Sequence, residues 1–103
     1  MTKIEKFFPL EHLTSSGHFP GNPIIPGAVL LAEVMLALET SLNRKLSPYK
    51  IKSAKFSSPV RPGDRFVIEF AETIQNEFKF QCMVGETIAL TGSVKCDSLP
   101  TAL

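Results

Sequence analysis

Hydrophobic and polar residues alternate through most of the second half of the chain, a pattern typical of strands with one buried face. A short apolar-rich run at Ile4–Pro9 adds a candidate edge strand. Two turns punctuate the alternation, Pro62-Gly63-Asp64 and the hairpin pair Gly85-Glu86, and Asp64 is expected to cap the first through its side chain. The alternating stretches are Tyr49–Phe56, with weaker alternation, and those around Phe66–Phe70, Phe78–Val84 and Ile88–Cys96.

Gly27–Leu42 follows a different pattern and predicts a helix, because Leu, Ala, Met and Glu dominate it and Pro26 suits a first helical turn. The helix is apolar on nearly every face up to Leu38, so it is expected to be buried on all sides. It turns polar from Glu39, and Pro48 ends any continuation.

One buried helix with a run of strands joined mostly by short turns predicts an α+β fold, with a largely antiparallel sheet curled around the helix. Residues 1–103 are expected to form a single domain. Residues 13–26 are predicted to be loop, since three prolines and two glycines interrupt them, and residues 97–103 are predicted to fray.

The composition suggests that the hydrophobic core is shared with a second subunit or with a ligand. The chain has 103 residues, of which 44% are hydrophobic and eight are Phe, whereas a monomer of this size buries a small core. Homo-oligomerisation or a lipid-like ligand would bury the hydrophobic residues that such a small core does not accommodate. The net charge of +1 is scattered, which argues against a nucleic-acid partner. The sequence has neither a signal peptide nor a bilayer-spanning stretch, so a cytoplasmic protein without membrane insertion is expected.

The ionisable and sulfur-bearing residues are few in the middle of the chain. Between His12 and Glu39 only His18 and Glu33 ionise near neutral pH. His18 leads a loop stiffened by three prolines, and a base beside an apolar segment suits acid–base chemistry on an apolar substrate. His12, His18 and Glu33 lack metal-site spacing, so no metal is predicted. Cys82 and Cys96 are expected to be reduced, buried thiols.

Two blocks resemble a known family. Residues 17–27 carry His-Phe-Pro-x-x-Pro-x-x-Pro-Gly and residues 54–64 carry Phe-x-x-Pro-Val-x-Pro-Gly-Asp. These are similar to motifs of the β-hydroxyacyl-acyl-carrier-protein dehydratases, and the chain is closest in pattern to their short, stand-alone type. The resemblance implies a hotdog fold, in which a curved antiparallel sheet wraps one long helix, and a dimer with the acyl chain at the subunit interface.

The resemblance also implies roles for individual residues. His18 would be the base that removes a C2 proton from a 3-hydroxyacyl thioester, and the Gly27 N–H would stabilise the oxyanion. The implied substrate contacts are Phe19, Pro26, Gly27, Ala28 and Ala32. The implied partners are acyl carrier protein or an acyl-CoA thioester, and a homodimer, a larger homo-oligomer or a heterodimer with a catalytic homologue. No cofactor is implied, because the elimination needs none.

The family's reaction also needs an acid that assists departure of the C3 hydroxyl, and here the chain departs from the family pattern. The family places Asp or Glu fourteen residues after the histidine, where this chain has Ala32, and Glu33 is one residue later. One residue turns a helix by about 100°, so Glu33 should not point where the family's acid points. Three alternatives stay open: Glu33 replaces the acid, the chain binds acyl thioesters beside a catalytic partner, or it has another hotdog activity such as thioester hydrolysis. Glu33 could also form only a salt bridge across a dimer interface.

Overall fold

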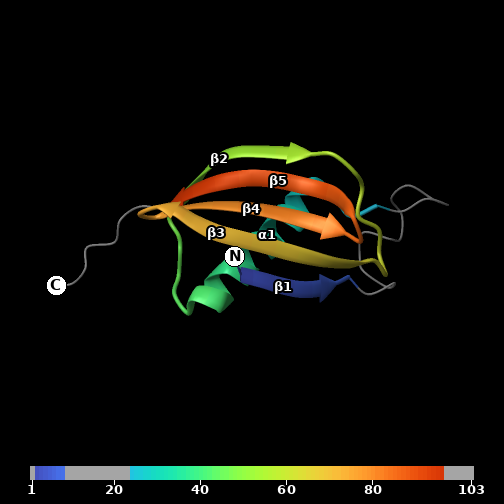
Figure 1. Ribbon diagram of the computed structural model, residues 1–103, viewed down its shortest axis with the longest axis horizontal. Coiled ribbons are helices and arrows are strands. Elements are labelled where there is room, and N and C mark those ends of the chain that lie inside the picture. The colour runs from blue at the N-terminus through green and yellow to red at the C-terminus, as the bar shows by residue number, and fades with distance from the viewer. Residues whose placement is uncertain (1, 9–23, 97–103) are drawn as a thin grey trace.

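The secondary structure follows the predicted order of one strand, one helix and four strands (Figure 1). The computed structural model describes residues 2–8 and 24–96, so the predictions for residues 13–23 and 97–103 lie outside the described residues. The elements are β1 (Thr2–Phe7), α1 (Gly27–Leu42), β2 (Tyr49–Phe56), β3 (Arg65–Ile74), β4 (Glu77–Val84) and β5 (Thr87–Cys96).

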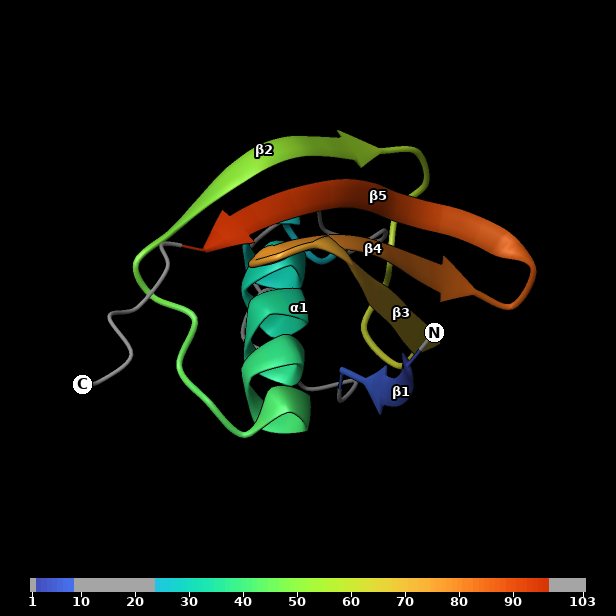
Figure 2. The ribbon, with the colours of Figure 1, turned by 60° about the vertical axis from the view of Figure 1, so that its left-hand side comes forward.

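The five strands form one antiparallel sheet in the order β1-β3-β4-β5-β2. The two hairpins place β3, β4 and β5 side by side in the middle, while β1 and β2 occupy opposite edges. The sheet curves over α1, which lies against its concave side (Figure 2). The predicted α+β fold, with a curved antiparallel sheet around one helix, is therefore confirmed.

The core lies between the concave face of the sheet and one side of α1. On the helix, Val34 and Leu38 are fully buried. On the sheet, most of the apolar positions predicted from the alternation are buried, but Val84 is half-buried and Ile88 is 41% exposed, contrary to that prediction. Phe8, just beyond β1, stacks on Phe66 with ring centroids 5.2 Å apart. The buried sheet residues are Phe66, Ile68, Phe70, Phe78, Phe80, Cys82, Ala89, Leu90, Val94 and Cys96.

The prediction that α1 is buried on all sides is wrong. Ala28, Ala32 and Leu36, spaced four residues apart, form one exposed stripe, and Leu36 is 51% exposed. A single curved sheet contacts only one side of a helix, so the apolar residues on the other side are left uncovered in this chain. Tyr49 and Phe56 on β2 are further large apolar residues that remain partly exposed.

The turns are built as the sequence predicts. Gly85 takes a positive φ of 61° in the two-residue hairpin between β4 and β5. The Asp64 carboxylate accepts a hydrogen bond from the Arg61 N–H at 2.9 Å, which confirms its expected capping role. Both cysteines are buried thiols outside any disulfide. In the described part of the chain, no helix is long and apolar enough to cross a bilayer.

Candidate functional site

The predicted site residues that the structure describes lie on the first two turns of α1. Pro26 precedes the helix, Gly27 and Ala28 begin it, and Ala32 and Glu33 follow one turn later. His18 and Phe19 lie outside the described residues, so their predicted roles as base and substrate contact stay predictions. The helix start is thus the part of the predicted site that the described residues form.

Among residues 2–8 and 24–96, no side chain caps the first turn of α1. Pro26 stands at the N-cap position, makes no side-chain hydrogen bond, and accepts from the N–H groups of Val29 and Leu30 through its carbonyl. No acidic residue lies in the first turn. The first N–H groups of a helix have no partner within the helix and carry its positive dipole end. The Gly27 end of α1 therefore suits a developing negative charge on an oxygen atom.

A groove of about 410 Å³ lies beside this helix start. Hydrophobic side chains dominate its walls, and the only polar side chains among its described residues are two serines. None of these residues ionises near neutral pH, which suits the chain of an acyl group rather than a charged ligand. The lining residues are Ile24, Ile25, Gly27, Leu30, Phe56, Ser57, Ser58, Pro59 and Val60.

Main-chain hydrogen bonds hold the two walls of the groove together. The Ile25 N–H donates to the Val60 carbonyl at 2.7 Å, which fixes the segment before α1 against the segment after β2. The Ser57 N–H donates to the Ala89 carbonyl at 2.8 Å. Ala89 is the extra residue of a β-bulge, because Cys82 pairs with Leu90 and Met83 pairs with Ile88. The bulge thus presents a carbonyl to the groove wall.

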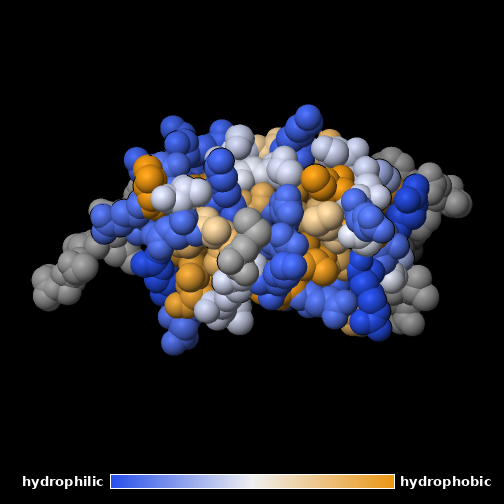
Figure 3. All heavy atoms as spheres, viewed as in Figure 1, coloured by the Kyte–Doolittle hydropathy of each residue, from blue (hydrophilic) through white to orange (hydrophobic). Residues whose placement is uncertain are grey.

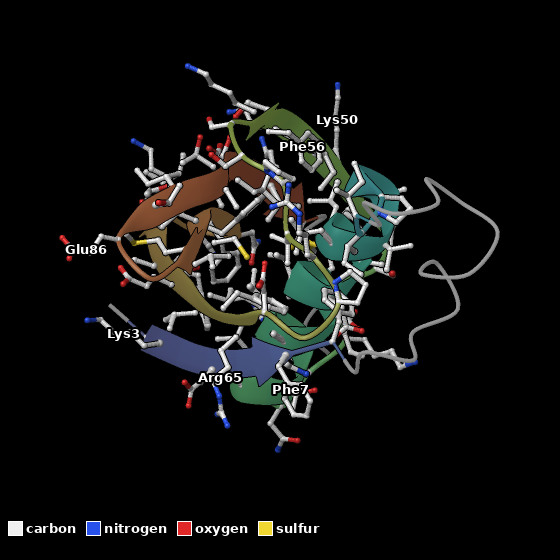
Figure 4. The ribbon with its side chains drawn as sticks, turned by 90° about the vertical axis from the view of Figure 1, so that its right-hand side faces the viewer. Lys3, Phe7, Lys50, Phe56, Arg65 and Glu86 are labelled. Carbon is white, nitrogen blue, oxygen red and sulfur yellow. The ribbon has the colours of Figure 1, made fainter. Side chains whose placement is uncertain are left out.

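Gly27 and Phe56 meet inside the groove. A Cβ atom added at Gly27 would lie 2.9 Å from two ring atoms of Phe56, closer than side chains normally approach. The missing side chain of Gly27 therefore leaves room for the ring. Phe56 is 49% exposed and lies at the end of β2 (Figure 4). Phe56, Pro59 and Val60 were not predicted to be site residues, although all three are fixed positions of the second motif.

Glu33 is engaged on the side of α1 that faces β1. Its carboxylate lies 3.6 Å from the Lys6 ammonium group, and both side chains are 32% exposed. The ion pair lies within one chain, whereas the sequence also allowed a salt bridge across a dimer interface. Ala32 belongs to the exposed stripe with Ala28 and Leu36, and neither Ala32 nor Glu33 lines the groove. The structure therefore groups Gly27 with the groove and leaves Glu33 outside it.

A helix held in a curved five-stranded antiparallel sheet, with an apolar groove at the helix start, defines a hotdog protein. The sequence profile of the ApeI-like family, described as ApeI dehydratase, matches residues 1–93, and the chain belongs to this family. A 3-hydroxyacyl-acyl-carrier-protein dehydratase, FabZ of Koribacter versatilis, is 33% identical, with 97% of this chain and 67% of that protein covered. FabZ of Ehrlichia canis is 40% identical over 64% of this chain. The chain spans about half the length of several such curated relatives, 53% for E. canis.

Solved structures support the same fold. The dehydratase heterocomplex ApeI:P from Xenorhabdus doucetiae has a TM-score of 0.74 at 22% identity, covering 91% of this chain and 85% of that one. The (R)-hydratase from A. caviae involved in PHA biosynthesis has a TM-score of 0.65 at 19% identity, covering 92% of each chain. At these identities the likeness concerns the fold.

Proposed function

We propose that this chain is a dehydratase-like hotdog protein that binds 3-hydroxyacyl thioesters and takes part in the elimination of water from them. The observation that carries the proposal is the apolar groove that ends at the uncapped start of α1, where Gly27 lies. Such a groove offers an apolar wall to the acyl chain and an N–H group to the thioester oxygen. Family membership supports the reaction class.

The proposed reaction begins with His18, which takes a proton from C2 of the substrate. The Gly27 N–H stabilises the negative charge that develops on the thioester oxygen, and the electrons then form the C2–C3 double bond as the C3–O bond breaks. An acid protonates the departing hydroxyl, so water leaves. A positioned acid or base contributes about 10²–10⁴ in rate, and an oxyanion donor about 10²–10³.

A second candidate function is that of a partner subunit whose acid comes from another chain. The Lys6–Glu33 ion pair favours it, because it engages the Glu33 carboxylate outside the groove, and Ala32 offers no acid on the exposed stripe. The ApeI:P structure, with which the fold agrees, is described as a heterocomplex. In this candidate the chain supplies the groove, His18 and Gly27, and a homologous subunit supplies the carboxylate.

The proposed setting is a cytoplasmic assembly of two hotdog subunits, either two copies of this chain or this chain with a catalytic homologue. The uncovered stripe of Ala28, Ala32 and Leu36 supports an assembly, because a second subunit would bury it. The proposed substrate carrier is acyl carrier protein, with coenzyme A as the alternative. No cofactor or metal takes part in the proposed reaction.

The testing experiment incubates the purified chain with a 3-hydroxyacyl carrier protein and follows the enoyl product by mass spectrometry. If the chain carries the complete site, it turns over, and His18→Ala and Glu33→Gln each lower the rate by about 10²-fold or more. If the acid is missing, Glu33→Gln has no effect, and Ala32→Glu raises the rate of the chain alone. Binding of the acyl carrier without turnover supports the partner subunit. If the chain neither binds the acyl carrier nor turns it over, both candidate functions are contradicted.

A further inference from the structure

The outer face of the sheet, which is the face turned away from α1, carries a pocket of about 450 Å³. Residues of β2, β5, β4 and β3 line this outer pocket, so it extends across four neighbouring strands. In Figure 1 the outer face is turned towards the viewer, with α1 behind the sheet. Figure 3, in the same view, shows hydrophilic side chains rising over this face among apolar ones.

The outer pocket is separate from the apolar groove at the start of α1. Lys55 and Phe56 are consecutive residues of β2, and consecutive side chains of a strand point to opposite faces of the sheet. Phe56 lines the apolar groove, whereas Lys55 lines the outer pocket. The sheet therefore lies between the two cavities, and the proposed binding of an acyl chain does not account for the outer one.

Two lysines face the outer pocket from the two strands that flank β5. Lys55 of β2 lies opposite Thr91, and Lys79 of β4 lies opposite Ser93, two residues further along β5. The strand spacing and the rise per residue place the Cα atoms of the two lysines about 12 Å apart, diagonally across β5. Each lysine has a long and flexible side chain, so both ammonium groups can reach one small ligand above β5.

The positive charge of the outer pocket is not balanced by the protein. Lys55 and Lys79 have no ion-pair partner among residues 2–8 and 24–96. The one carboxylate that lines the pocket, Glu69, lies 3.8 Å from the Lys3 ammonium group, and Lys3 is not a lining residue. Glu69 also accepts a hydrogen bond from the Gln81 amide at 3.2 Å. The pocket therefore keeps two uncompensated positive charges, which favour an anionic ligand.

Hydroxyl groups line the same pocket and can donate hydrogen bonds to an anion. Thr91 and Ser93 lie on β5, between the strands of the two lysines, and both are partly buried. The Ser93 hydroxyl lies 3.1 Å from the Ser53 hydroxyl, and since only one of the two donates to the other, one proton stays available for a ligand. A phosphate monoester presents three strong acceptor oxygens, which suits two ammonium groups and hydroxyl donors together.

We propose that the outer pocket binds a phosphate group, with Lys55 and Lys79 on its oxygens and the hydroxyls of Thr91 and Ser93 completing its hydrogen bonds. The phosphate is either inorganic or the ester group of a small hydroxylated molecule, for which the volume of the pocket leaves room. The site is distinct from the apolar groove, so the inference does not depend on the proposed reaction.

The test follows the amide chemical shifts of the isotope-labelled chain by NMR while inorganic phosphate, glycerol 3-phosphate or uncharged glycerol is added at constant ionic strength. The variant Lys55→Gln/Lys79→Gln removes both pocket lysines. The control variant Lys50→Gln/Lys95→Gln removes the same charge from two lysines that lie opposite each other on β2 and β5 but do not line the pocket. Circular dichroism spectra and thermal melting verify that both variants are folded.

Both phosphate compounds should cause saturable shifts at residues that line the outer pocket. The pocket variant should raise the Kd at least about tenfold and the control variant less than about twofold, because hydrogen bonds to charged groups are the strong ones.

Tighter binding of glycerol 3-phosphate than of inorganic phosphate supports an organic ester as the occupant, and equal binding supports phosphate itself. The proposal is overturned if the shifts do not saturate, if glycerol causes the same shifts, or if the two variants weaken binding equally. The titration needs no turnover, so these outcomes are separate from failure of the proposed reaction.

Discussion

Two glycines stand where a larger residue would collide with a neighbour, and the neighbours differ in kind. A Cβ at Gly92 would meet the main-chain carbonyl of Ser53 and the ring of Phe80. A Cβ at Gly27 would meet the ring of Phe56, which is half-exposed and can rotate. Gly92 therefore lets β2 approach β5 closely, whereas Gly27 makes room for a movable side chain.

Replacement of Gly92 by alanine should destabilise the fold more than the same change at Gly27. Gly92→Ala should lower the free energy of unfolding by about 1–3 kcal/mol, because a main-chain carbonyl cannot move aside without distorting the sheet. Gly27→Ala should change it by less than about 1 kcal/mol, because the ring can shift and alanine favours a helix. Urea unfolding measures both, and an equal loss at the two positions would contradict this reasoning.

Burial raises the pKa of the Cys82 thiol to about 12 from an ordinary value of 9.0. Above pH 9 the unfolded chain loses this proton while the folded chain keeps it, so the free energy of unfolding should fall as the pH rises from about 9 towards 12. Denaturant unfolding at several pH values measures this decline, and Cys82→Ala should reduce it. If the free energy of unfolding of the variant declines equally with pH, the decline comes from titratable groups other than the Cys82 thiol.

At the scale of elements, α1 ends in a hydrogen-bonded reversal of the chain. Asn43 has a left-handed conformation with φ 55°, and its N–H donates to the Thr40 carbonyl at 3.3 Å. The Arg44 N–H donates to the Glu39 carbonyl at 3.2 Å, which completes a Schellman motif. The Glu39 carboxylate also accepts from the Leu46 N–H at 2.9 Å, so one residue ties the helix end to the following segment.

The left-handed conformation at Asn43 predicts opposite effects of two small residues. Asn43→Ala should lower the free energy of unfolding by about 1 kcal/mol, because the short polar side chain of asparagine makes a left-handed conformation less costly than it is for alanine. Asn43→Gly should be neutral or slightly stabilising, since glycine adopts positive φ without strain. Thermal melting compares the two variants, and equal destabilisation by both would show that the Asn43 side chain itself matters.

The elements were predictable from the sequence because their signals are local. Alternation gave β3, β4 and β5, and Pro26 gave the start of α1. The exposed stripe of α1 was not predictable, because it depends on how far one sheet reaches around the helix. The helix period predicted that Ala32 and Glu33 point in different directions. The Lys6–Glu33 ion pair was not predictable, because its two residues are distant in sequence. The place of Phe56 in the groove likewise needed the fold.

At the scale of the whole molecule, the helix and the sheet share one continuous core. Neither can bury its apolar face alone, so residues 2–8 and 24–96 should unfold in a single cooperative transition. Far-ultraviolet circular dichroism reports the helix and sheet, and the near-ultraviolet signal of the single tyrosine reports its surroundings. The two curves should coincide in urea, and two separated transitions would show independent units.

The main-chain bonds that join the walls of the groove have a consequence for how such a protein can diverge. The Ile25–Val60 and Ser57–Ala89 bonds involve peptide groups alone, which every residue except proline can supply in full. These main-chain hydrogen bonds therefore depend little on which side chains the groove residues carry. Successive substitutions at positions such as Leu30 and Phe56 can therefore reshape the cavity for acyl groups of different length or branching while its outline is inherited intact.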